Sequence, residues 1–118
     1  PNLSRDVIYV KDVAHAFYLA MKSEQTYGLY NMTSGRGVTL QEQAEVIRDL
    51  WAPSENQKSK ITYKPEIVNN TPSYLFSMEK AKYDFGFVPE YADFRTMMTD
   101  YKKDLDRNKY QELFNYVK

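Results

Sequence analysis

Residues 5–14 have the sequence Arg-Asp-Val-Ile-Tyr-Val-Lys-Asp-Val-Ala. In this stretch a pattern typical of a β-strand is followed by one typical of an α-helix. Residues 6–10 are rich in β-branched and aromatic side chains, which predicts a short strand. Asp12 follows as a good helix N-cap. We expect an amphipathic helix over residues 13–22, because apolar side chains recur there at helical spacing. These side chains are Val13, Phe17, Ala20 and Met21.

The next part of the chain predicts a second strand and a second helix. The strand covers residues 28–32, and a glycine-containing turn follows over residues 34–37. Thr39 and Glu42 have the spacing of a capping box, in which each side chain satisfies a free N–H group at a helix start. Pro53 ends this helix. Its apolar face comprises Leu40, Ala44, Ile47 and Trp51.

The last part predicts one more strand and further helices. Residues 61–64 read as a third short strand, and residues 65–73 as an irregular loop. Ser77 can cap a helix that runs to about Phe85, with Gly86 as its stop. A long helix follows, with its apolar face at Phe94, Met97 or Met98, Tyr101 and Leu105. A terminal helix is expected from the apolar positions Tyr110, Leu113, Phe114 and Val117.

These elements predict one α/β unit over residues 1–118, an α+β-like subdomain with few short strands and about four to five helices. Short strands in such small number make a poor independent sheet. We therefore expect them to complete, or pack on, a sheet outside this chain. The chain begins with Pro-Asn-Leu-Ser rather than Met, so we expect a fragment or a processed product.

Composition excludes several classes of function. The 16 basic and 16 acidic residues give a formal net charge of zero and are interleaved along the chain. No basic stripe suited to nucleic acid or an anionic membrane is present in the sequence. The chain has no Cys, which excludes disulfides and thiolate metal sites and fits a cytoplasmic protein. No apolar run approaches the length of a membrane span.

Four motifs resemble the NAD-dependent epimerase/dehydratase family, the extended short-chain dehydrogenase/reductases. They are the stretch at residues 5–14, Gly-Leu-Tyr-Asn at 28–31, the Gly-x-Gly turn and capped helix at 34–42, and residues 78–89, where Lys-Ala precedes Phe-Gly-Phe-Val-Pro. The resemblance implies the C-terminal, substrate-binding part of such an enzyme. It also implies an N-terminal Rossmann domain that holds NAD or NADP and the catalytic Tyr-x-x-x-Lys, with no cofactor bound by this chain itself.

The resemblance makes Arg5 the first substrate-binding candidate. In epimerases of the family, the Arg of this Arg-Asp motif contacts the diphosphate of the sugar nucleotide. A planar guanidinium suits that role, because it stays charged and binds phosphate oxygens bidentately. The structural alternative is a surface Arg that pairs with Asp6 or caps a carbonyl.

Lys64 and Tyr74 are the remaining substrate-binding candidates. The family often has a second phosphate-binding Arg after the third strand, but residues 65–74 contain no Arg and include Glu66, which would repel a pyrophosphate. Lys64 could substitute as a point charge, or be an exposed strand-end Lys. Tyr74 could face the substrate, or be a core or rim aromatic. The missing Arg leaves open a substrate with less negative charge than a sugar nucleotide.

We expect no catalytic or metal-binding residue on this chain. Tyr18 and Lys22 spell Tyr-x-x-x-Lys, but they lie beside ordinary packing positions, and the family has its catalytic pair upstream. His15 lies opposite the apolar stripe of its helix and is expected to be solvated. A lone His without Cys or clustered carboxylates is a poor metal site. Charged residues on helical polar faces are also expected to be solvated, namely Glu42, Glu45, Asp104, Asp106 and Arg107.

The sequence thus predicts the substrate-binding portion of an NAD(P)-dependent nucleotide-sugar epimerase or dehydratase. Family resemblance implies transient hydride transfer at a sugar carbon, carried by residues outside this chain. One alternative is a reductase or dehydrogenase of a non-nucleotide substrate, and another is a non-catalytic protein-interaction domain. The apolar terminal face over residues 110–117 closes the core, docks on the Rossmann domain, or meets a second subunit in a homodimer.

Overall fold

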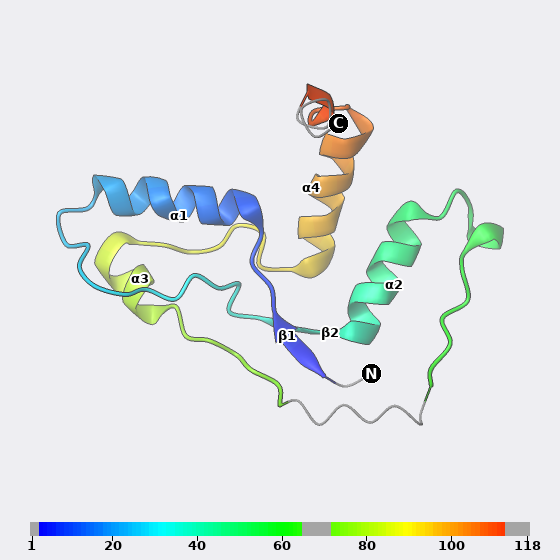
Figure 1. Ribbon diagram of the computed structural model, residues 1–118, viewed down its shortest axis with the longest axis horizontal. Helices are drawn as coiled ribbons and strands as arrows, with labels where there is room; N and C mark the ends of the chain where they lie inside the picture. The colour runs from blue at the N-terminus through cyan, green and yellow to red at the C-terminus, as the bar shows by residue number, and fades with distance from the viewer. Residues whose placement is uncertain (1–2, 65–71, 113–118) are drawn as a thin grey trace.

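The computed structural model describes residues 3–64 and 72–112 and shows a small α/β unit (Figure 1). Its described part contains four α-helices and one two-stranded antiparallel sheet, which confirms the predicted fold class. The order is β1 (Ser4–Asp6), α1 (Val10–Lys22), β2 (Gly37–Thr39), α2 (Leu40–Trp51), the 3₁₀ turn η1 (Glu55–Gln57), α3 (Glu79–Phe85) and α4 (Phe94–Asp106).

The strands differ from those predicted. In the sheet, Ser4 pairs with Thr39, Arg5 with Val38 and Asp6 with Gly37. The strand predicted over residues 6–10 is therefore wrong in position, and residues 28–32 and 61–64 form no strand. β propensity measures how well a side chain fits a half-buried pleated surface, and a segment without a neighbouring strand gains nothing from it. The carbonyls of Tyr27 and Leu29 instead accept hydrogen bonds from Lys80 Nζ, each at 3.0 Å.

Helix α1 begins three residues earlier than predicted, and Asp12 is not its N-cap. The N-cap is Tyr9, whose backbone is extended and whose side chain makes no capping bond. Asp12 lies in the first turn and is buried. Its two carboxylate oxygens accept the backbone N–H groups of Glu90 at 2.8 Å and Tyr91 at 3.0 Å. The carboxylate therefore holds the segment that leads into α4.

Helix α2 confirms the predicted capping box. The Thr39 hydroxyl accepts the backbone N–H of Glu42 at 3.1 Å, and the Glu42 carboxylate accepts the backbone N–H of Thr39 at 2.7 Å. The helix ends at Trp51, with Ala52 as C-cap and Pro53 just beyond, as Pro cannot continue a helix.

Helices α3 and α4 also follow local signals. Met78, not Ser77, is the N-cap of α3, although the Ser77 hydroxyl accepts the Glu79 N–H at 3.3 Å. Gly86 ends α3 with φ of 70°, as predicted, since a residue without Cβ adopts the left-handed conformation at little cost. The predicted long helix is confirmed as α4, with Asp93 as its N-cap. The predicted terminal helix lies largely outside the described residues.

The core is small and the molecule is open. One buried cluster joins α1 to α3 and consists of Ala16, Ala81, Phe85 and Phe87. The radius of gyration is 17.5 Å, whereas a compact domain of this length has about 13–14 Å. Several large apolar side chains are almost fully exposed: Met21, Tyr27, Leu29 and Tyr83. Figure 1 shows α2 and α1 at opposite sides of the molecule, with α4 between them.

Candidate functional site

The sheet and residues 72–76 form the candidate site. Consecutive residues of β1 each bond to this segment. The backbone N–H of Ser4 donates to the Ser73 hydroxyl at 3.0 Å, and Arg5 Nη1 donates to the Pro72 carbonyl at 3.1 Å. The Asp6 carboxylate accepts the Phe76 N–H at 3.3 Å. Two parts of the chain almost 70 residues apart are thereby held side by side.

Asp6 links this segment to the glycine turn before β2. Its other oxygen accepts the Ser34 backbone N–H at 3.1 Å and the Ser34 hydroxyl at 2.8 Å. Burial raises the pKa of Asp6, but hydrogen bonds from Thr33, Ser34 and Phe76 outweigh it and hold the pKa below its usual value. The carboxylate is therefore ionised at neutral pH, and both of its oxygens accept hydrogen bonds from other residues of the chain.

The two glycines of the turn are required by their neighbours. Gly35 has φ of 68°, and a Cβ added there would lie 2.7 Å from Met78 Cε. A Cβ on Gly37 would clash with the hydroxyl of Ser4 on the paired strand. The space beside both glycines is thus filled by the chain's own side chains.

The predicted substrate-binding residues are only partly brought together. Arg5 is half-buried on β1 and caps the Pro72 carbonyl, two residues before Tyr74. Tyr74 is 52% exposed, and its ring stacks on Phe76 with centroids 6.3 Å apart and 21° between planes. Tyr74 is thus a surface aromatic, not a core one. Lys64 is exposed, and the hydrogen bonds of the described residues do not join it to the other two.

A second polar cluster joins the start of α1 to the end of α4. Asp104 was expected to be solvated, and this is wrong, since its residue is only 6% exposed. It accepts from Tyr110 Oη at 2.9 Å and pairs with Lys11 Nζ at 2.8 Å. The hydrogen bond from Lys11 is the main reason why the pKa of Asp104 falls to about 2. Lys11 and Tyr9 also bond to Asp100.

This cluster has the character of a structural clamp. Burial, followed by the hydrogen bond to Asp100, raises the pKa of Tyr9 well above its usual value. The hydrogen bonds to Asp100 and Asp104 likewise raise the pKa of Lys11. A phenol and an ammonium whose protons are held so firmly are poor general acids or bases at neutral pH. We therefore place the cluster outside the candidate site.

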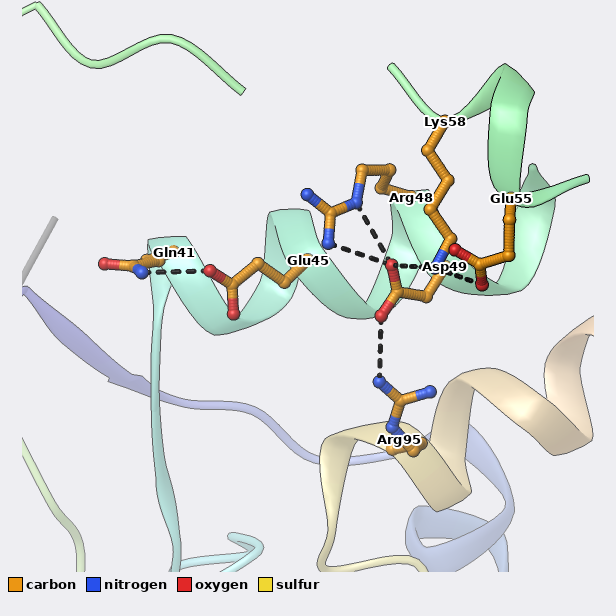
Figure 2. A network of polar contacts seen from close by, with 7 residues as sticks. All are labelled: Gln41, Glu45, Arg48, Asp49, Glu55, Lys58 and Arg95. Atoms are coloured by element: carbon orange, nitrogen blue, oxygen red, sulfur yellow. Dashed lines mark hydrogen bonds and ion pairs between the residues drawn. The ribbon is translucent and has the colours of Figure 1, made fainter. Parts of the chain in front are cut away.

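A third network connects α2, η1 and α4 (Figure 2). Asp49 accepts from Arg48 Nη2 at 2.9 Å and pairs with Lys58 at 3.3 Å and Arg95 at 3.4 Å. Lys58 also pairs with Glu55 at 2.7 Å. The bond from Arg48 is the main cause of the lowered pKa of Asp49. The network links the end of α2 to η1 and to the start of α4, and its partly exposed ion pairs contribute modestly to stability.

The other sequence predictions concern surface residues. Lys22 Nζ donates to Tyr18 Oη at 3.1 Å, and both side chains are exposed on α1, away from β1. His15 is exposed, as predicted. In residues 3–64 and 72–112, no group of three or more His, Cys, Asp or Glu side chains is arranged to hold a metal ion. None of the helices described is long and apolar enough to cross a bilayer.

Sequence reasoning missed Asp6 and Ser34 as organisers of the site. Asp6 was assigned only to the predicted strand and to a surface pair with Arg5. Its position next to Arg5 was a usable signal, because adjacent residues of a strand point to opposite faces of the sheet. If the Arg5 side chain lies on one face, the Asp6 side chain lies on the other. The partner of Asp6 could not be identified in advance, since Ser34 and Phe76 are 28 and 70 residues away.

Comparison with known proteins supports the resemblance to the epimerase and reductase family. The chain is 30% identical over 101 residues to UDP-glucose 4-epimerase of Corynebacterium glutamicum, covering 81% of this chain and 29% of that protein. It is 31% identical over 100 residues to UDP-glucose 4-epimerase of Halalkalibacterium halodurans, covering 80% and 28%. It is 27% identical over 85 residues to dTDP-4-dehydro-6-deoxyglucose reductase of Escherichia coli, covering 72% and 26%.

These similarities are confined to part of each relative. The chain spans less than a third of the length of the curated relatives that it matches. No protein-family model matches the chain, and no solved structure matches it. By their names, the relatives are two epimerases and a reductase. The similarity to this chain covers between 26% and 29% of the length of each of them.

Proposed function

We propose that this chain is the substrate-binding portion of an NAD(P)-dependent nucleotide-sugar epimerase or dehydratase. It would act together with a Rossmann domain that carries the cofactor and the catalytic residues. The observation that carries the proposal is the joining of β1 to residues 72–76, which sets Arg5 and Tyr74 on neighbouring segments. A guanidinium beside an exposed aromatic ring suits a phosphate next to a sugar or base.

The open shape supports a second domain. Large apolar side chains on α1 and on the loop before β2 are exposed, among them Phe17, Met21 and Leu29. Exposed apolar surface of this extent marks a contact with other protein. We assign NAD or NADP to the Rossmann domain, as the resemblance to the family implies.

The test uses the intact protein as its source encodes it. Titration calorimetry would measure the binding of UDP-glucose and of NAD, and absorbance at 340 nm would follow any bound NADH. We expect UDP-glucose to bind and Arg5→Ala to weaken it by about tenfold or more, the cost of a charge-assisted hydrogen bond. Arg107→Ala, an exposed Arg at the end of α4, is the matched control and should leave binding unchanged.

A reductase or dehydrogenase of a less charged substrate is the second candidate. It is favoured by residues 65–74, which contain no Arg. Binding of NAD(P) without binding of any sugar nucleotide would support this candidate. Failure to bind both, together with a stoichiometric protein partner, would refute both enzyme proposals in favour of an interaction domain.

A further inference from the structure

Helix α2 carries an apolar stripe that the described part of the chain leaves open. Leu40, Ala44, Ile47 and Trp51 recur at helical spacing and therefore share one side of the helix. Leu40 is 65% exposed, Ile47 45% and Trp51 39%, and no residue of α2 is buried. A continuous row of exposed apolar side chains, unlike single ones, indicates a contact surface.

The stripe is one wall of a groove. Ala44, Ile47 and Trp51 line a space of about 360 Å³ together with Pro53 and Ile61 from the segment after the helix. The small Ala44 side chain leaves room between its larger neighbours for an apolar side chain from another molecule. In Figure 1, α2 lies at the opposite side of the molecule from α1, whose exposed side chains we assigned to the Rossmann domain. The groove on α2 therefore requires a different partner.

Charge beside the stripe changes sign along the helix (Figure 2). Glu45, in the first half of α2, accepts a hydrogen bond from a neutral amide at 2.9 Å and makes no ion pair within residues 3–64 and 72–112. The network at the end of α2 holds three cations and two carboxylates, which leaves one net positive charge: Arg48, Lys58, Arg95, Asp49 and Glu55. An antiparallel helix of the same sequence therefore matches α2 in charge, with its positive end beside Glu45.

We propose that two copies of this chain associate through α2, with the two helices antiparallel and related by a two-fold axis. Such an interface uses the same surface on both copies. With the axis at the middle of the stripe, Ala44 packs against the partner's Ile47 and Leu40 against the partner's Trp51. Small and large side chains then alternate across the contact, as in the packed centre of protein interfaces.

The charges of the same arrangement are complementary. Glu45 and Arg48 are three residues apart, so they lie on one flank of the stripe. Antiparallel packing brings Glu45 of one copy close to the partner's Arg48, and symmetry repeats this pair at the other end. A parallel arrangement would instead place like charges side by side. The two pairs set the direction of the helices, and the apolar stripe supplies most of the affinity.

The experiment measures self-association of the intact protein by sedimentation velocity over a series of concentrations. We expect the unmutated protein to associate, and Ile47→Glu to weaken association by about 100-fold or more, because two carboxylates would be buried in the contact. Glu45→Arg and Arg48→Glu should each weaken it by about tenfold, since like charges would then meet twice. Lys82→Glu, an exposed change on α3, is the matched control and should have no effect.

The decisive variant combines Glu45→Arg with Arg48→Glu. It exchanges the two charges, so antiparallel packing predicts that association returns to nearly its original strength. Circular dichroism would show that each variant is folded. Association as weak in the double variant as in the single ones would overturn the antiparallel arrangement. A monomeric unmutated protein, or a number of subunits that Ile47→Glu leaves unchanged, would overturn the interface itself.

Discussion

Replacing Asp12 by Asn tests whether its carboxylate is a tertiary clamp or a helix cap. The side chain is 1% exposed and accepts two backbone N–H groups, from Glu90 and Tyr91. Asn presents one acceptor oxygen and one NH2 group, so one of the two N–H groups would face another donor. Hydrogen bonds to charged groups contribute about 1.5–3 kcal/mol each, and a buried unsatisfied donor costs about 1–3 kcal/mol.

We therefore expect Asp12→Asn to lower the free energy of unfolding by about 2–3 kcal/mol, and Asp12→Ala by about 3–5 kcal/mol. For a domain of this size, the first value corresponds to a fall in Tm of about 10 °C. Urea unfolding and thermal unfolding, both followed by circular dichroism, would measure the two quantities. Asp93→Asn is the matched control, because Asp93 is a true N-cap and Asn caps helices as well as Asp does.

The result that would refute the reasoning is a small loss, below about 0.5 kcal/mol, for both Asp12→Asn and Asp93→Asn. Asp12 would then behave as an ordinary cap, and its bonds to Glu90 and Tyr91 would contribute nothing to stability. A large loss for Asp12→Asn with a small one for Asp93→Asn would establish that α1 holds the entry to α4.

Three further predictions concern stability. The pKa of Asp104 is lowered to about 2 from 3.8, so its stabilisation is full above about pH 4 and is lost as pH falls towards 2. Urea titrations at pH 5 and pH 3 should show a drop that Asp104→Asn makes smaller, while Asp6 and Asp49, whose pKa values are also lowered, contribute to the rest. Gly86→Ala should cost about 1 kcal/mol in urea unfolding, because the left-handed backbone at φ of 70° disfavours a Cβ although there is space for one; no loss would show that α3 ends differently. Thr39→Ala should cost about 1 kcal/mol by removing one half of the capping box, while Thr99→Ala, inside α4, serves as the comparison.

Much of the helical structure was predictable because its signals are local. The capping box of Thr39 and Glu42 and the stop at Gly86 each depend on residues within one helical turn. Their energies are present before any tertiary contact forms. The covered face of α4 was predictable only in part: the apolar spacing indicates Met97, which is buried, but also Tyr101, which is exposed, and it misses the buried Asp104.

The candidate site was predictable only in part. The resemblance identified Arg5, and the structure places Tyr74 on the neighbouring segment. Nothing in the local sequence could show that Asp6 would bond to Ser34 and Phe76 at once. The pairing of Arg5 with Val38 also depends on the register between β1 and β2, which joins residues more than 30 positions apart.

By itself the sequence determined where the helices form, the capping box of α2, the stop of α3 at Gly86 and the family that the chain resembles, because these depend on short spacings and on residue types. Only the tertiary structure decided which extended segments became strands, and which carboxylates were buried. A strand needs a partner for its backbone, and a buried carboxylate such as Asp12 or Asp104 needs donors from elsewhere in the fold. For Asp12 those donors lie 78 and 79 residues away. That is why local patterns indicated a cap at Asp12 where the fold has a clamp.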